Sequence, residues 1–165
     1  MLQAEYRDFA SEYAERVKAH FDDRLVSICF FGSTARGEAS LESDIDVLVI
    51  AENLPRDYGL RIRETNRIHE LLRKGEVYKR LRSTGASGFI SDVYLTREEA
   101  QSHPPILLDV ADHGIVVYDR EGFLAGVLED IRERLRQLGG RKIRARKGYY
   151  WVLKPDAKPT EVVEI

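Results

Sequence analysis

The sequence has few of the residues and none of the runs that mark secreted or membrane proteins. It contains one cysteine, Cys29, so no internal disulfide can form and a buried, unreactive thiol is expected. No apolar run approaches the roughly 18 residues that a membrane-spanning helix needs. The N-terminus lacks the basic and then apolar order of a signal peptide. We therefore expect a cytoplasmic protein with no membrane association.

Other scarcities narrow the class further. The four histidines share no regular spacing, which argues against a zinc site. Methionine and tryptophan occur once each, and asparagine and glutamine are also scarce, whereas 33% of the residues are charged. This composition is typical of a thermophile. With 165 residues and a 43% hydrophobic fraction, the chain is long enough to form one globular domain.

Hydrophobic periodicity predicts an α+β fold, with a small mixed β-sheet flanked by helices. Apolar residues three and four apart predict helices over 2–21, 58–82 and 123–138, the second with a break near Gly75. Nearly continuous apolar runs predict buried strands over 25–31, 45–51, 89–95 and 114–118. Residues 1–103 are predicted to form the core, and residues 104–165 a helical and basic extension packed on it within one compact domain.

Two carboxylates, Asp44 and Asp46, stand where the strand over 45–51 begins. Residues two apart on a strand project to the same side, so these side chains should be neighbours. Two such charges about 4 Å apart repel by about 4 kcal/mol at an effective dielectric near 20. No basic residue stands nearby in the sequence to relieve this repulsion. A divalent cation would, and oxygen ligands favour Mg²⁺, with Mn²⁺ as the alternative.

A glycine–serine turn follows the first predicted strand. Gly32 permits a tight turn and close backbone approach to a ligand. If Ser33–Arg36 begins a helix, its free N–H groups point at one spot that attracts phosphate, and Ser33 and Arg36 add a hydroxyl and a charge. An equally good interpretation of Arg36 is a surface charge. Phosphate beside Mg²⁺ indicates a nucleoside triphosphate or a phosphodiester, and in-line displacement at phosphorus.

A third acidic ligand is expected from another strand. Asp92 is a lone carboxylate within the apolar strand predicted over 89–95, where a structural role is unusual. We predict that it binds the metal that prepares the attacking hydroxyl and takes its proton. An edge-strand residue facing water is the alternative interpretation, and Asp109 and Asp112 are rival ligands.

The sequence Gly32-Ser33, ten residues, Asp44-Ile45-Asp46 resembles the G-S-x10-D-x-D signature of the nucleotidyltransferase superfamily typified by DNA polymerase beta. It is similar in particular to the minimal nucleotidyltransferases of archaea and bacteria. The resemblance implies a polymerase beta palm-like fold and transfer of a nucleoside monophosphate from a triphosphate, ATP being expected, to an acceptor hydroxyl with release of pyrophosphate. It also implies roles for individual positions: triphosphate binding by Gly32, Ser33 and Arg36, and metal binding and catalysis by Asp44, Asp46 and Asp92.

Alternatives stay open at this point. Small proteins of this family serve as antitoxins that bind, and in some cases nucleotidylate, a helical ribonuclease toxin, and a non-catalytic nucleotide-binding or RNA-binding module is a third hypothesis. The acceptor is open between a partner protein, RNA, an antibiotic and a small metabolite, and a homo-oligomer is also compatible. The basic and aromatic segment 141–155 either contacts phosphate and base or docks a tail on the core.

Overall fold

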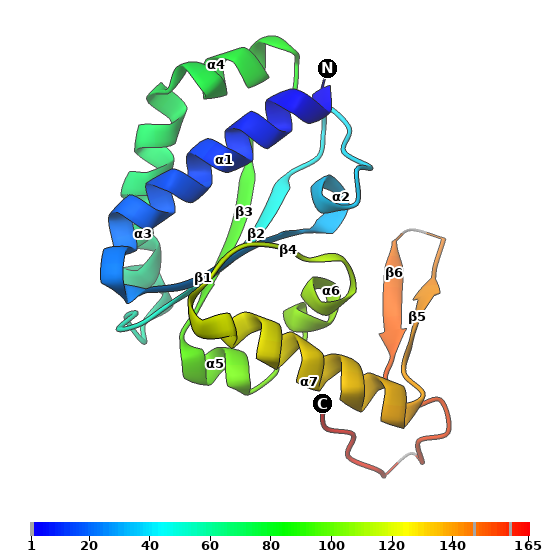
Figure 1. The fold of residues 1–165 in the computed structure, drawn as a ribbon. Helices are drawn as coiled ribbons and strands as arrows, with labels where there is room; N and C mark the ends of the chain where they lie inside the picture. Colours follow the sequence, from blue (N-terminus) through cyan, green and yellow to red (C-terminus); the bar gives the residue numbers. More distant parts are fainter. Residues whose placement is uncertain (1, 147, 159) are drawn as a thin grey trace.

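A four-stranded mixed sheet forms the centre of the computed structural model, which describes residues 2–146, 148–158 and 160–165 (Figure 1). Its strands are β1 (Leu25–Phe31), β2 (Ile45–Ala51), β3 (Ile90–Leu95) and β4 (Ile115–Asp119), in the order β3-β2-β1-β4. β1 is antiparallel to both β2 and β4, whereas β2 and β3 are parallel. The predicted α+β fold with a mixed sheet flanked by helices is confirmed.

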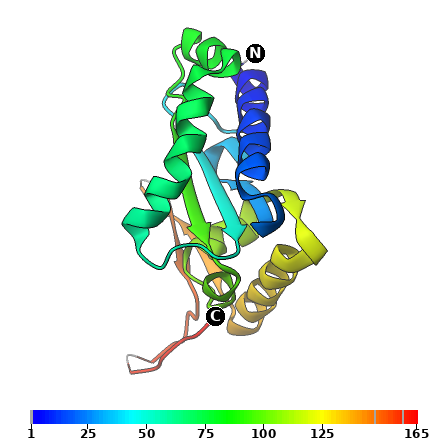
Figure 2. The ribbon, with the colours of Figure 1, turned by 90° about the vertical axis from the view of Figure 1, so that its left-hand side faces the viewer.

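Helices α1 (Leu2–Phe21), α3 (Tyr58–Lys74) and α4 (Glu76–Ser83) cover one face of this sheet. The apolar stripe of α1 is buried, as its spacing predicts, with Phe9, Tyr13 and Val17 all inaccessible to solvent. The long predicted helix divides at Gly75, whose backbone is extended (φ −71°, ψ 152°). Figure 2 shows α3 running alongside β3, the outer strand on this side of the sheet.

The other face packs against α6 (Ile106–His113) and α7 (Phe123–Leu138), with α5 (Arg97–Gln101) at one end. Because helices cover both faces, all seven residues of β1 are buried. The hydrophobic cluster between the sheet and helices α6 and α7 is the second core of the protein. Cys29 lies in it, and burial raises the pKa of its thiol to about 12. Two short 3₁₀ turns, η1 (Asp22–Arg24) and η2 (Arg120–Gly122), lead into β1 and α7.

The C-terminal segment adds a feature that the sequence did not predict. Residues after α7 form a separate antiparallel hairpin of β5 (Arg141–Arg144) and β6 (Tyr149–Val152), which stands beside α6 in Figure 1. The segment 104–165 also supplies β4, so it contributes to the central sheet as well as packing on it. Among the described residues, no helix combines the length and the apolar character needed to cross a bilayer.

Candidate active site

Asp44 and Asp46 are neighbours at the start of β2. Asp44 directly precedes the strand and is exposed, whereas Asp46 is half-buried within it. Burial first, and then the negative charge of Asp44, raise the pKa of Asp46 above its ordinary value. The two carboxylates therefore act on each other electrostatically, as their spacing predicts.

Gly32 lies against one of these carboxylates. β1 pairs Phe31 with Asp46, and the chain turns at the next residue with a left-handed backbone (φ +70°). A Cβ at position 32 would overlap Oδ2 of Asp46 and lie 2.9 Å from its Cγ. The backbone conformation at position 32 thus favours glycine, and a side chain there would also displace the Asp46 carboxylate.

The turn continues into the short helix α2 (Gly32–Ala35), which contains Ser33. The Thr34 hydroxyl donates to the backbone carbonyl of Asp44 at 3.0 Å, so the turn is fastened to the start of β2. Arg36 follows and pairs with Glu38 at 2.8 Å. Its positive charge partly opposes the rise in the pKa of Asp46. The structure therefore brings the glycine–serine turn and the Asp44–Asp46 pair together, with Arg36 at their margin.

Asp92 lies elsewhere, and its assignment as a third metal ligand and proton acceptor is corrected. The parallel register pairs Asp46 with Ser91, and Val47 with Asp92. Residues paired in register on neighbouring strands share a face of the sheet, so Asp92 shares the side of Val47, which is packed in the core beneath α1 and α3. Asp46 and Ser91 share the opposite side.

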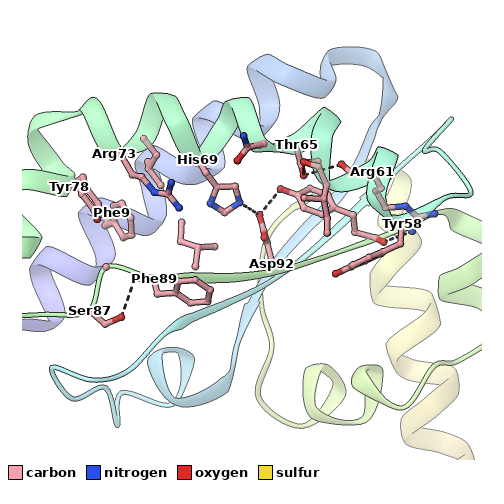
Figure 3. A pocket seen from close by; sticks show the side chains of 16 residues that line it. Phe9, Tyr58, Arg61, Thr65, His69, Arg73, Tyr78, Ser87, Phe89 and Asp92 are labelled. Atoms are coloured by element: carbon pink, nitrogen blue, oxygen red, sulfur yellow. Dashed lines mark hydrogen bonds and ion pairs between the residues drawn. The ribbon is translucent and has the colours of Figure 1, made fainter.

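The surroundings of Asp92 explain why a carboxylate is stable there. Its Oδ2 accepts hydrogen bonds from the hydroxyl of Tyr94 (2.6 Å) and from Nε2 of His69 (2.7 Å) (Figure 3). It also accepts one from the hydroxyl of Tyr13 (2.7 Å). Burial alone would raise the pKa of Asp92, but the bonds from His69 and Tyr94 outweigh it and hold the pKa below its ordinary value. Asp92 is thus an ionised acceptor joining α1, α3 and β3.

Two further residues act on Asp46: Ser91, which the sequence analysis did not select, and Asp109, which it named as a rival ligand. The Ser91 side chain hydrogen-bonds Asp46, and the charge of Asp109 on α6 adds to the rise in the pKa of Asp46. The sequence alone could not identify Ser91, because its place beside Asp46 depends on the register between β2 and β3. Asp109 was named as a rival ligand, although its side chain is engaged elsewhere.

The β5–β6 hairpin engages Asp109 and the other rival, Asp112. Nζ of Lys142 lies 3.1 Å from Oδ1 of Asp109 and 2.9 Å from Oδ2 of Asp112. The indole of Trp151 donates to the same Asp109 oxygen at 3.1 Å and packs against the second core. Lys142 and Trp151 therefore dock the hairpin on α6, as one of the two interpretations of this segment predicts, while Tyr149 and Tyr150 stay exposed.

The donor set at the Asp44–Asp46 pair fits a hard divalent cation. Both side chains offer carboxylate oxygens, and burial, followed by the negative charge of Asp44, holds the pKa of Asp46 above its ordinary value. In the described part of the chain, no group of three or more His, Cys, Asp or Glu side chains is arranged to hold a metal. A cation at this pair would therefore complete its ligands with water or with substrate oxygens.

Comparison with known proteins gives a consistent result. A family model described as a nucleotidyltransferase domain matches residues 10–104, more than half of the chain. A Methanocaldococcus jannaschii protein, MJ1305, provisionally named a protein adenylyltransferase, is 33% identical over 129 residues, which is 77% of this chain and 81% of that protein.

Solved structures are more distant. A Sulfolobus solfataricus nucleotidyltransferase is 21% identical and matches with a TM-score of 0.48, covering 73% of this chain and 86% of its own. A chain from the complex of a tri-AMPylated Shewanella oneidensis HEPN toxin with its MNT antitoxin is 15% identical, with a TM-score of 0.42 and coverage of 84% and 93%.

Proposed function

Because this chain belongs to the nucleotidyltransferase domain family, we propose that it is a metal-dependent enzyme that transfers a nucleoside monophosphate from a triphosphate to an acceptor hydroxyl and releases pyrophosphate. One observation carries this proposal. The carboxylates of Asp44 and Asp46 interact beside a glycine that could not bear a side chain without striking Asp46. Such a pair next to an open turn suits a cation bridged to phosphate oxygens.

In this proposal, different residues of the chain bind the metal and the triphosphate. Asp44 and Asp46 would hold Mg²⁺, with Mn²⁺ as a substitute, and divalent ions in such sites neutralise charge on the phosphates and activate the attacking oxygen. Gly32 leaves room for the Asp46 carboxylate. The backbone of the Gly32–Ser33 turn would bind the triphosphate, and the Ser33 hydroxyl would donate to a phosphate oxygen. Arg36 supplies positive charge at the margin of the site, although its bond to Glu38 must be shared or exchanged when phosphate binds.

The acceptor in this proposal is a hydroxyl on a protein. The name of the Methanocaldococcus jannaschii relative, a protein adenylyltransferase, supports a protein acceptor and ATP as the donor. A narrower form, predicted from the family resemblance, is an antitoxin that binds and modifies a helical ribonuclease toxin. That form would be supported by a stable complex with a small helical protein encoded next to it, and by labelling of that protein.

The decisive experiment follows the labelled nucleotide. The protein is incubated with ATP labelled at the α-phosphate, Mg²⁺ and a lysate of its source cells, and labelled products are separated. We expect Mg²⁺-dependent label on an acceptor with the wild type, and at least about a hundredfold less with Asp44→Asn or Asp46→Asn, since each removes a metal ligand. Full labelling by either folded variant would refute the assignment.

A further inference from the structure

A pocket of about 330 Å³ lies between α3 and β3, and the residues assigned to nucleotidyl transfer do not line it (Figure 3). We call it the α3–β3 pocket. Its polar groups include Asp92, His69, Asn66 and Arg73, and its volume is in the range of pockets that bind a ligand or a large side chain. Its apolar walls are Phe9, Tyr58, Ile62, Leu72, Tyr78, Phe89 and Ile90.

Ser87 connects this pocket to the carboxylate pair. It lines the pocket, and its hydroxyl lies 3.4 Å from Oδ1 of Asp44, within hydrogen-bonding range. The same hydroxyl oxygen accepts from the backbone N–H of Phe89 at 3.2 Å, which fixes the segment between the two sites. A molecule held in the α3–β3 pocket could therefore extend past Ser87 to Asp44.

The order of the strands indicates which substrate this pocket serves. The Gly32–Ser33 turn follows β1, on one side of β2, whereas β3, which lines the α3–β3 pocket on the face covered by α1 and α3, is on the other side of β2. In-line displacement places the attacking and leaving oxygens on opposite sides of the phosphorus. If the pyrophosphate sits at Gly32–Ser33, as the proposed function requires, the acceptor approaches from the side of β3.

The surface of the pocket suits a polypeptide better than a nucleic acid. Tyr58, Ile62 and Phe89 are more than half exposed at its edge. Both aliphatic and aromatic surface is therefore accessible for contact with a partner. Arg61 is paired with Glu99, but Arg73 has no ion pair with any carboxylate that the structure describes. Among the described lining residues, Asp92 is the single carboxylate, and its Oδ2 already accepts three hydrogen bonds.

From this arrangement we propose that the α3–β3 pocket docks an acidic segment of the acceptor protein, with a large apolar side chain in the pocket and a carboxylate on Arg73. This inference rests on the proposed function. The docked segment presents its hydroxyl at Asp44. The hydroxyl oxygen forms a bond to the α-phosphorus, the bond from that phosphorus to the bridging oxygen breaks, pyrophosphate leaves with the electron pair, and the hydroxyl proton passes to water.

The test uses defined polymers as probes and the full-length protein. A fluorescent random copolymer of glutamate and tyrosine represents an acidic, apolar-anchored polypeptide, a lysine–tyrosine copolymer reverses the charge, and poly(U) represents single-stranded RNA. We expect the acidic copolymer to bind, measured by fluorescence anisotropy, and its affinity to fall about tenfold or more with Phe89→Ala and with Arg73→Glu. Arg134→Glu, at an exposed position of α7 outside the pocket, is the matched control and should leave the affinity unchanged.

The outcomes separate this inference from the proposed function. Binding of a non-hydrolysable ATP analogue with Mg²⁺ should persist in Phe89→Ala and Arg73→Glu and be lost in Asp44→Asn. The inference is overturned if the acidic copolymer does not bind, or if it binds both pocket variants as tightly as the wild type. In either case, binding of the ATP analogue would still support the proposed function. Poly(U) binding that both variants weaken overturns it in favour of RNA. Loss of analogue binding in the wild type instead refutes the proposed function.

Discussion

Asp46 occupies the space that a side chain at position 32 would need. The carboxylate Oδ2 would overlap a Cβ at Gly32, and the left-handed backbone there (φ +70°) disfavours a side chain independently. The glycine of the turn and the second aspartate of the strand are thus fitted to each other. The family signature joins two residues that are fourteen positions apart in sequence and in contact in space.

We expect Gly32→Ala to abolish Mg²⁺-dependent ATP binding. An alanine Cβ would displace the Asp46 carboxylate from its present position and so disturb the ligand pair, in addition to straining the backbone by about 1 kcal/mol or more. The measurement is titration calorimetry with a non-hydrolysable ATP analogue, together with urea unfolding.

Gly122→Ala is the control for this variant. Gly122 has nearly the same backbone conformation (φ +67°), but a Cβ there meets nothing within 4 Å. It should therefore lower the free energy of unfolding by about 1 kcal/mol and leave nucleotide binding unchanged. Unimpaired binding by Gly32→Ala would mean that the carboxylate does not need its present position.

Asp46→Asn should stabilise the metal-free protein. Burial and Asp44 raise the pKa of Asp46, so the ionised group is unfavourable in the fold at neutral pH, and the amide removes this cost. The Tm of the metal-free variant should therefore be higher than that of the wild type. Mn²⁺ should raise the Tm of the wild type and not that of Asp46→Asn. A lower Tm for the variant without metal would contradict the inferred repulsion.

Asp92→Asn should destabilise the fold without removing metal binding. The amide cannot replace a carboxylate oxygen that accepts from Tyr13, Tyr94 and His69, so we expect a loss of about 2–4 kcal/mol in urea unfolding at pH 7. Asp130→Asn, at an exposed site on α7, should change stability by about 0.5 kcal/mol or less. Loss of Mn²⁺ binding in folded Asp92→Asn would restore the role that the sequence suggested.

The same pair of proteins should show a defined pH dependence. The pKa of Asp92 is lower in the fold than its ordinary value of 3.8, so its ionised form stabilises the native state above that pH. This contribution is lost as the pH falls below 3.8 through the folded pKa. The stability difference between wild type and Asp92→Asn should therefore shrink as the pH falls below 3.8. A difference that grows on acidification would reverse the inferred sign.

Arg61 should tolerate little change. Its buried guanidinium donates to the backbone carbonyls of Pro55 and Tyr94 and to both carboxylate oxygens of Glu99. Lysine cannot reproduce this fork, so Arg61→Lys should cost about 2–4 kcal/mol in urea unfolding. Arg63→Lys, at an exposed position of the same helix, should be close to neutral. Equal stability of the two variants would show that the bonds of Arg61 add little.

Local pattern was sufficient to predict the strands and the carboxylate pair, because Asp44 and Asp46 depend only on alternation within one chain segment. The position of Asp92 cannot be predicted from its own chain segment alone. Which face a residue of β3 occupies is set by its pairing with β2, and a shift of one residue exchanges Ser91 and Asp92 between faces. The sequence contains no local signal for that register, so a lone carboxylate within an apolar strand was expected on the same side of the sheet as Asp46, whereas the register places it on the other side.

The C-terminal hairpin was missed for a related reason. Its strands have only four residues each, and the basic run beginning at Arg141 has no apolar alternation to mark a strand. The hairpin is held by tertiary contacts, chiefly Lys142 and Trp151 on Asp109. Such contacts involve residues more than thirty positions apart, so they become visible only once α6 is in place.

The burial of Cys29 gives this protein a built-in reporter. It is the chain's single sulfhydryl, it is inaccessible to solvent, and its pKa of about 12 leaves almost no thiolate at neutral pH. Alkylating reagents should consequently ignore the folded molecule and modify only chains in which the second core has opened. The rate of that modification would measure how often the second core opens, and no probe would have to be attached to the protein beforehand.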